Sequence, residues 1–423
     1  MVEELNENNK RGKVYFVNND LLYLPSIAEI CGFEAKVNQT SIIENGISEA
    51  LVYSPDFLVA NVSFGKFREY LENLAKFKEL SPKTKIIVTG DPFLTYNNNV
   101  TYENPFLDYV IMGETEYVFR DIIEGEDNSK IMGICYTDDN MQAAKSEIRP
   151  FIENLDNLPY PARHLMKNNK TVVIEVSRGC PYHCFFCLAT VKNGAAYRVR
   201  TPESIINEIK YCIEKYGTKH IYFKADNFNF DKNWVLELCE KIISSGLNFD
   251  WYCDLTPKNI DDNMADLMKK SGCSLCRIGA ESGSSEILEK LDKDITKESI
   301  IETVKVLKKH KIKTLSMFMF GLPWETEETA EETTKFALEL NSDDTIFNIA
   351  IPLPATKFFV YAMLNRFFFD KPDFTESETK VIVKTHKLSR EKVAEIKNLA
   401  EKRYYNQPRF IIRNYLRRIF NRH

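Results

Sequence analysis

The amino-acid sequence predicts an α/β protein with two successive sheets and a helical C-terminal extension. Three observations lead to this prediction. Short apolar strands alternate with amphipathic helices over residues 1–125, and six further strand–helix repeats begin at Thr171. Three cysteines fall within eight residues directly after the first strand of the second series. The first series indicates a doubly wound parallel sheet, and six repeats favour a partial (β/α)6 barrel over the usual closed eight-stranded one.

Composition places the chain among ordinary globular proteins. Of 423 residues, 44% are hydrophobic and 28% are charged, and the net charge of −5 argues against a nucleic-acid partner. The longest nearly unbroken apolar run, Leu315–Trp324, is about half the length of a membrane-spanning helix. The first residues, MVEELNENNKRGK, lack the apolar segment of a secretory signal. We therefore expect a cytoplasmic protein.

The first domain, residues 1–125, is expected to be Rossmann-like. Its helices are predicted over residues 20–31, 66–80 and 116–123. Its strands are predicted over residues 14–18, 34–38, 57–63, 85–91 and 108–113. Ligands of such sheets bind at the carboxyl ends of the strands, where residues 19–20, 89–91 and 113–115 form turns.

Residues 126–166 are predicted to be a linker with a weak hairpin around 134–141, because the segment is polar and contains Pro150, Pro159 and Pro161. The barrel follows over residues 167–365. Its strands are predicted at 171–177, 220–225, 249–255, 274–281, 313–320 and 344–351. Its helices are predicted near 202–215, 232–245, 262–271, 284–291, 297–309 and 326–340. Residues 366–423 are predicted to form a helical C-terminal extension.

The strongest chemical signal is the sequence SRGCPYHCFFC, in which Cys180, Cys184 and Cys187 have the spacing C-x3-C-x2-C. Three thiolates on one short loop can bind three irons of a cubane and leave the fourth iron open to a small chelating ligand. A structural zinc site usually has four ligands in two pairs, and Cys273 and Cys276 could supply a second pair only from a distant turn. The position after a barrel strand favours the catalytic cluster, and zinc is the alternative.

With this motif the chain resembles the radical SAM superfamily, in the branch that carries a cobalamin-binding domain. The resemblance implies a [4Fe–4S] cluster on the three cysteines, with S-adenosylmethionine bound at the open iron. Reductive cleavage would then yield methionine and a 5′-deoxyadenosyl radical that abstracts hydrogen from a substrate. The electron donor implied is a reduced flavodoxin or ferredoxin.

Further segments carry the resemblance and suggest cofactor-binding residues. Asp226 and Asn227 in IYFKADNFNFD stand where the family approaches the methionine amino group, although both could simply be turn formers or helix caps. Arg200, in YRVR, resembles a basic residue that often follows the cluster loop.

Three later strand ends also resemble the family, and the first of them matches closely. Glu281 and Ser282 in RIGAESGS stand where the family contacts the ribose or carboxylate of S-adenosylmethionine. Gly321 in MFMFGLPWET resembles a turn near adenine, and Ala355 in IPLPATKF departs from a glycine that the family usually has. The sequence identifies no catalytic side chain beyond these cofactor contacts.

The resemblance also implies cobalamin, but the first domain departs from the family's pattern. TGDPF (89–93) stands where two glycines and a histidine usually occur, and Asp91 replaces the second glycine. No histidine precedes His164, so this domain cannot supply an imidazole ligand to cobalt. Asn18 and Asn19 lead directly into a helix where the family has a long loop. Two readings stay open for the domain, a cobalamin site and a scaffold.

The expected reaction is methyl transfer to an unactivated carbon, with cobalamin as the methyl carrier. Oxidative cyclisation or rearrangement without methyl transfer is the first alternative, and a non-catalytic cluster-binding protein is the second. From Lys402 to His423 all charged side chains are basic, and apolar residues lie between them at helical spacing. This tail is expected either to dock on the barrel or to touch an anionic membrane surface, which would suit a hydrophobic or lipid substrate.

Overall fold

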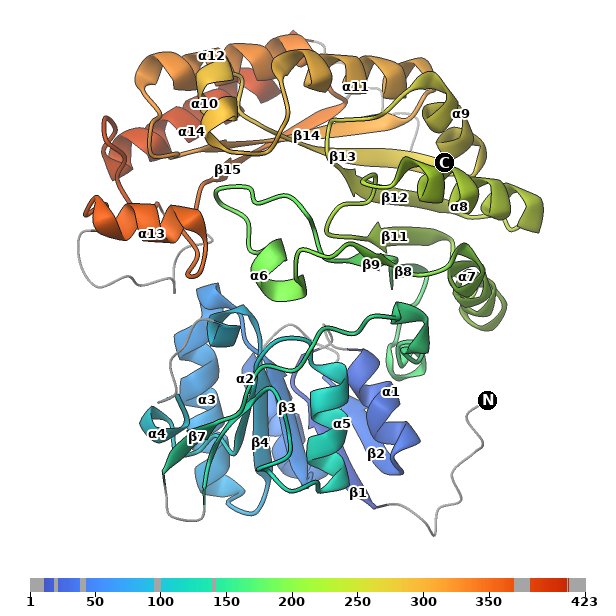
Figure 1. Ribbon diagram of the computed structural model, residues 1–423, viewed down its shortest axis with the longest axis vertical. Coiled ribbons are helices and arrows are strands. Elements are labelled where there is room, and N and C mark those ends of the chain that lie inside the picture. Colours follow the sequence, from blue (N-terminus) through green and yellow to red (C-terminus); the bar gives the residue numbers. More distant parts are fainter. Residues whose placement is uncertain are drawn as a thin grey trace. The chain divides into compact units, whose positions relative to one another are not determined.

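The computed structural model describes residues 11–18, 22–38, 43–94, 100–138, 142–368, 381–408 and 410. The chain forms two compact units, which Figure 1 shows in blue to teal and in green to red. The first unit is built from residues 1–169 and the short segment 191–194. The second contains residues 170–190 and most of the chain from residue 195 onward.

The first unit contains a seven-stranded sheet in the order β2-β1-β3-β4-β5-β6-β7. Its first five strands are parallel, and their order is the flavodoxin-like one of doubly wound domains. These strands are β1 (Gly12–Phe16), β2 (Phe33–Val37), β3 (Phe57–Asn61), β4 (Lys85–Thr89) and β5 (Tyr109–Ile111). The predicted doubly wound fold is therefore confirmed.

Helices cover both faces of this sheet. The helices are α1 (Tyr23–Ile30), α2 (Ile43–Tyr53), α3 (Phe67–Leu80), α4 (Val100–Glu103) and α5 (Glu116–Glu124), with 3-10 turns at Phe64–Lys66 and Asp91–Leu94. Apolar side chains of α1 and α5 pack on one face, and those of α2 and α3 pack on the other. Burial of alternate strand residues on both faces explains why the strands are nearly continuously apolar.

The predicted linker, residues 126–166, differs in the structure, because its first part belongs to the sheet. Strand β6 (Ile134–Thr137) pairs antiparallel with β5, and β7 (Ala143–Lys145) pairs antiparallel with β6. Two 3-10 turns follow, at Leu155–Asn157 and Arg163–Leu165. Apolar side chains around the first of these turns pack with Tyr23 and Tyr117, so the segment is part of the first unit.

The second unit is an open, parallel six-stranded sheet in the order β15-β14-β13-β12-β11-β8, which confirms the partial barrel. Its strands are β8 (Thr171–Glu175), β11 (His220–Lys224), β12 (Asp250–Leu255), β13 (Cys273–Glu281), β14 (Lys313–Phe320) and β15 (Asp344–Ile349). Two short strands, β9 (Ser177–Arg178) and β10 (Arg198–Val199), form a separate antiparallel pair beside the cysteine loop.

Helices line the outer side of this sheet (Figure 1). They are α7 (Pro202–Tyr216), α8 (Lys232–Ser245), α9 (Asp262–Lys270), α10 (Ser285–Lys290), α11 (Lys297–Lys309) and α12 (Glu327–Leu340). The main core lies between most of these helices and alternate residues of the strands, such as Ile221, Phe223, Trp251 and Ile278. Short α6 (Ala189–Asn193) follows the cysteine loop.

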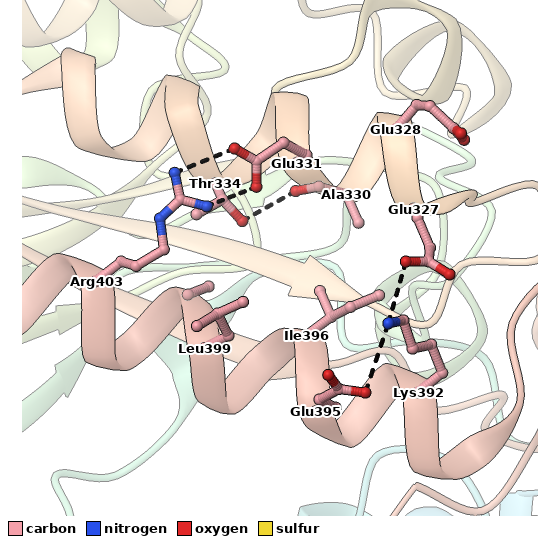
Figure 2. A pocket seen from close by; sticks show the side chains of 11 residues that line it. Glu327, Glu328, Ala330, Glu331, Thr334, Lys392, Glu395, Ile396, Leu399 and Arg403 are labelled. Atoms are coloured by element: carbon pink, nitrogen blue, oxygen red, sulfur yellow. Dashed lines mark hydrogen bonds and ion pairs between the residues drawn. The ribbon is translucent and has the colours of Figure 1, made fainter.

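The C-terminal part adds α13 (Lys357–Leu364) and α14 (Arg390–Tyr405). Helix α14 packs on the barrel core through Val393, Ala400 and Tyr404. Between α12 and α14 lies a shallow groove of about 360 Å³, across which Arg403 forms a two-point ion pair with Glu331 (Figure 2). The basic tail predicted as an amphipathic helix lies outside the described residues from 411 onward. No described helix has the length and apolar character that crossing a membrane requires.

Candidate active site

The parallel strands of the second unit bring four predicted segments to one edge of the sheet. The cysteine loop follows β8 and β9, and Asp226 and Asn227 follow β11. Glu281 ends β13, and Gly321 follows β14. Because the strands run in the same direction, their carboxyl ends share one rim, where active sites of βα barrels lie.

Backbone contacts hold the cysteine loop in a compact shape. Gly179, with φ of 85°, donates its N–H to Asp226 Oδ2 at 2.7 Å. The Thr190 hydroxyl donates to the carbonyl oxygens of Cys180 and Tyr182 at 3.2 and 2.9 Å. Phe185 N donates to Leu291 O at 2.9 Å. The loop is therefore fixed independently of any bound group.

The three thiols differ in environment but face the same charges. Cys180 is buried, Cys184 is half-buried and Cys187 is exposed. Burial raises the pKa of Cys180, and it raises the pKa of Cys184 to about 12, while the Lys293 ammonium acts to lower both values. Cys184 also feels the charges of Cys180 and Cys187, which places all three thiols in one electrostatic environment.

This donor set fits a cubane better than a single metal ion. Within the described ranges, no three His, Cys, Asp or Glu side chains converge closely enough to hold one ion. In a cubane each thiolate binds a different iron, so its ligands need not converge on one point. The remaining polar groups of the rim would supply the surroundings of the fourth iron.

Asp226 and Asn227 lie directly against the cysteine loop. Asp226 accepts the Gly179 N–H, and the Asn227 amide donates to Cys180 Sγ at 3.9 Å. The amide oxygen of Asn227 accepts from the Thr256 hydroxyl at 3.3 Å. Both residues therefore support the loop from the neighbouring strand, which is a structural role. Contact of either residue with a cofactor stays a prediction.

Glu281 is paired with a lysine that sequence reasoning missed. Lys293, in the segment between α10 and α11, donates to Glu281 Oε1 and to Gly279 O, the latter at 2.8 Å. The side chains of Lys293 and Glu281 are only 11% and 9% exposed. Glu281 has a φ of 61°, a conformation that costs energy in a residue other than glycine. The sequence shows only a lysine that follows the GAESGS segment, and such a lysine resembles an ordinary surface charge.

The Ser282 hydroxyl is engaged within the protein. It shares a 3.0 Å hydrogen bond with the Thr333 hydroxyl and accepts the Ser284 N–H at 3.1 Å. Thr333 also accepts the Gly283 N–H at 3.0 Å. Because Ser282 is fully buried, it shapes the turn after β13. Its predicted contact with S-adenosylmethionine stays a prediction.

Gly321 begins a turn that is organised by a buried acid. Its φ is 92°, and its N–H donates to Glu325 Oε2 at 2.7 Å. Burial raises the pKa of Glu325 to about 8, against the lowering effect of the Gly321 and Leu322 N–H groups. At neutral pH this carboxyl is therefore largely protonated, and it adds no charge at the rim.

Arg200 lies in a buried network on the helix side of the loop. Its guanidinium pairs with the fully buried Glu208 of α7, and Nη2 donates to the Ser204 hydroxyl at 2.8 Å. Its carbonyl oxygen accepts the Trp234 indole N–H at 2.9 Å. These contacts give Arg200 a structural role, and its predicted cofactor contact stays a prediction.

The first unit has its own switch point between β1 and β3, where doubly wound sheets bind ligands. There the Asn18 amide donates to Asn61 O at 2.9 Å and accepts the Asn61 N–H at 3.0 Å. Next to it, Gly90 has a φ of 128°, and an added Cβ would lie 2.0 Å from Val62 O. Gly90 is thus required by the protein's own backbone.

Comparison with known proteins agrees with the rim geometry. Residues 174–337, which span the cysteine loop and most of the barrel, match the Radical SAM superfamily. The chain is 30% identical over 362 residues to an uncharacterised methyltransferase of Pyrococcus horikoshii, covering 83% of this chain and 78% of that protein. The chain belongs to the radical SAM superfamily. It is therefore a radical SAM enzyme, and the cofactors of this family are a [4Fe–4S] cluster and S-adenosylmethionine.

The chain is also similar to a second curated protein and to a solved structure. The anaerobic magnesium-protoporphyrin IX monomethyl ester cyclase of Rubrivivax gelatinosus is 26% identical, and the match spans 67% of this chain but only 54% of the cyclase. The radical S-adenosylmethionine methyltransferase TsrM of Kitasatospora setae, solved with cobalamin and a [4Fe–4S] cluster, has a TM-score of 0.69 at 18% identity. That match covers 84% of this chain and 74% of TsrM, and it shows that this chain has the same fold as TsrM.

Proposed function

We propose that this radical SAM enzyme is a cobalamin-dependent methyltransferase that acts on an unactivated carbon. The carrying observation is the rim of the second unit, where three thiols lie beside the buried Lys293–Glu281 pair. The first unit, with its flavodoxin-like strand order, supports the cobalamin part of the proposal. TsrM, whose fold is similar, is a methyltransferase solved with cobalamin.

In this proposal the residues of the rim bind and position S-adenosylmethionine. Cys180, Cys184 and Cys187 would hold the cluster, and Lys293 would pair with the carboxylate of S-adenosylmethionine. Glu281, at the end of β13, would accept hydrogen bonds from the ribose or the amino group. When bound, the cofactors supply the electron, the radical and the methyl group, and the protein supplies orientation and exclusion of water.

Cobalamin would bind at the carboxyl edge of the first unit. Residues 1–163 contain no histidine, and His164, the next one, is bonded to Glu29 at 2.8 Å, so the strand ends of this sheet would give cobalt no imidazole ligand. The turn after β5, at Gly113, is the proposed position of close approach, because an added Cβ there would meet only Ile148, at 3.5 Å. The linked amides of Asn18 and Asn61 would form the floor of this site.

A radical SAM cyclase without methyl transfer is the second candidate. The observation that favours it is the similarity to the magnesium-protoporphyrin cyclase over two thirds of this chain. The mass of the product discriminates the two reactions. Methyl transfer adds one CH₂ unit for each event, whereas oxidative cyclisation removes hydrogen.

The enzyme needs a one-electron reductant and a substrate, as radical SAM enzymes do. We propose a reduced flavodoxin or ferredoxin as the reductant. A hydrophobic or lipid substrate would suit peripheral membrane contact through the basic tail. Liposome flotation of the full chain and of a chain ending at Asn406 tests this contact, because equal flotation of both would remove the tail from the proposal.

The methyl-transfer proposal is tested by anaerobic reconstitution with iron, sulfide and hydroxocobalamin, followed by gel filtration. We expect corrinoid absorbance to elute with the protein. We also expect S-adenosylhomocysteine to form when the protein is reduced in the presence of S-adenosylmethionine. A protein that cleaves S-adenosylmethionine to 5′-deoxyadenosine but retains no corrinoid would refute methyl transfer through cobalamin and favour the cyclase reaction.

A further inference from the structure

A charged and aromatic cluster lies on the inner face of the second unit's sheet, below the rim. Side chains alternate between the two faces of each strand. On β11, β12 and β13, residues such as Phe223, Cys253 and Ile278 face the helices and belong to the main core. Tyr222, Tyr252, Asp254 and Arg277 alternate with these residues and are only half-buried. They therefore occupy the opposite, inner face.

Within this inner-face cluster, Arg277 is held by two neighbouring strands. Its Nε and Nη2 atoms donate to the two carboxylate oxygens of Asp254, the second at 2.6 Å. Nη2 also donates to the Tyr222 hydroxyl at 2.9 Å, and this hydroxyl donates to Asp254 Oδ2 at 2.7 Å. The Tyr222 and Tyr252 rings stack 4.8 Å apart, and the guanidinium carbon of Arg277 lies 4.8 Å from the Tyr222 centroid.

This arrangement leaves one side of the guanidinium available. Among the described residues, the two N–H groups of Arg277 Nη1 and the hydroxyl of Tyr252 have no hydrogen-bond partner. The side chains of Arg277 and Asp254 are 32% and 34% exposed. A guanidinium fixed on three of its five N–H groups is pre-organised to donate the other two to an acceptor.

Other charges on the inner face of β8, β11 and β12 are paired as well. His220 bonds Asp250 at 2.8 Å, and Lys224 bonds Glu175 at 2.9 Å. Towards β14 and β15 the same face carries half-buried Leu315 and Met317 and Ile346 at 41% exposure, beside Lys313 and Asp344, which alternate with buried residues in the same way. A face that combines paired charges with these apolar side chains suits an amphipathic molecule with an oxygen acceptor at one end.

We propose that Arg277 is a substrate-anchoring residue that binds a carbonyl or carboxylate oxygen of an amphipathic substrate. The apolar body of that substrate would lie on Leu315, Met317 and Ile346. This inference rests on the proposed function, since it names the substrate class of the same active site. Arg277 precedes Glu281 by four residues on β13, which places it roughly 13 Å below the rim at about 3.3 Å per residue. The reactive carbon would then lie nearer the rim than the anchored end.

The test measures binding of decanoate and decanamide to the anaerobically reconstituted full-length enzyme with S-adenosylmethionine, by calorimetry. Both probes are expected to bind the wild type, and Arg277→Met should weaken both by roughly tenfold or more. Asp254→Asn removes the neutralising charge, so it should strengthen decanoate binding several-fold and leave decanamide nearly unchanged.

Two controls keep the outcome interpretable. The double variant Arg277→Met/Asp254→Asn leaves no unpaired charge and should show the same loss as Arg277→Met. Arg403→Met removes a two-point pair of similar exposure, 34% and 41%, on the outer side of the barrel between α12 and α14 (Figure 2). It should bind both probes as the wild type does.

Unchanged binding by the double variant, or no binding of either probe by the wild type, would overturn the inference. 5′-Deoxyadenosine formation is measured in the same wild-type preparation. A wild type that cleaves S-adenosylmethionine but binds neither probe removes Arg277's role alone, whereas a wild type that does not cleave S-adenosylmethionine counts against the proposed function.

Discussion

Lys293 donates a hydrogen bond to Glu281 at the carboxyl end of β13, and this buried pair lies in the same electrostatic environment as the three cysteines. The two side chains come from different segments, because Glu281 ends a strand and Lys293 follows helix α10. Their charges compensate each other where either alone would be costly to bury. A cofactor with both a carboxylate and an ammonium group could exchange partners with such a pair without changing the net charge.

Lys293→Met is expected to abolish binding of S-adenosylmethionine and to destabilise the protein. An unpaired buried Glu281 should cost about 3–5 kcal/mol in the free energy of unfolding. The double variant Lys293→Met/Glu281→Gln should recover most of this stability but not the binding, as measured by denaturation and by calorimetry. Lys270→Met, which removes a surface pair with Asp266 on α9, is the control and should cost less than about 1 kcal/mol. Full binding by the double variant would contradict the assigned role.

Glu325 should make stability depend on pH. Its pKa is about 8 in the folded protein, because burial disfavours the charged carboxylate. The ordinary pKa of a glutamate side chain, which we take for the unfolded state, is 4.5. Below pH 4.5 both states are protonated and the residue costs nothing. Between pH 4.5 and about 8 only the unfolded state loses the proton, so stability should fall by about 1.4 kcal/mol per pH unit. Chemical denaturation of Glu325→Gln across this range should lack that contribution, and identical pH profiles would contradict the assignment.

Asp226 should matter for the cysteine loop. Asp226→Ala removes the acceptor of the Gly179 N–H, so iron content after reconstitution should fall clearly below that of the wild type. Asp231→Ala is a suitable control, because Asp231 caps helix α8 through the N–H groups of Asn233 and Trp234. That variant should lose about 1 kcal/mol of stability and keep its iron. Equal iron in both variants would mean that the loop does not depend on Asp226.

The two glycines Gly90 and Gly125 should differ in their tolerance of alanine. Both have positive φ, but a Cβ at Gly90 would lie 2.0 Å from Val62 O, whereas a Cβ at Gly125 meets no atom within 4 Å. Gly90→Ala should therefore destabilise the first unit by about 3 kcal/mol or more, and Gly125→Ala by about 1 kcal/mol. Thermal denaturation would measure both, and equal losses would argue against the close packing at Gly90.

Much of the second unit follows from its sequence, because most of its strands are short runs rich in apolar residues and several of its helices begin at a side-chain cap. Thr201, Asp231 and Asp261 accept backbone N–H groups at helix starts. Helix α2 was not predicted, since Asn45–Gly46 resembles a turn. In the structure Gly46 lies within that helix, where an added Cβ would meet the Asn38 amide at 2.6 Å.

Some site residues can be recognised from the sequence, and others only from the folded structure. The cysteines are recognisable because their spacing on one loop carries the chemistry. Lys293 is not recognisable, since its function depends on a contact with Glu281 that only the folded chain creates. The pair between the Arg200 guanidinium and the buried Glu208 is also a contact that only the folded chain reveals. Strand β6 likewise joins the sheet only through long-range pairing with β5.

The most direct test of the central claim is formation of 5′-deoxyadenosine. The full-length protein is reconstituted anaerobically with iron and sulfide, mixed with S-adenosylmethionine and dithionite, and analysed by mass spectrometry. Wild type should form 5′-deoxyadenosine, and Cys180→Ala should form none. Cys212→Ala, which alters a buried core cysteine of α7, should behave as the wild type. Zinc in place of iron, or equal product from wild type and Cys180→Ala, would contradict the assignment of this loop as the radical-generating site.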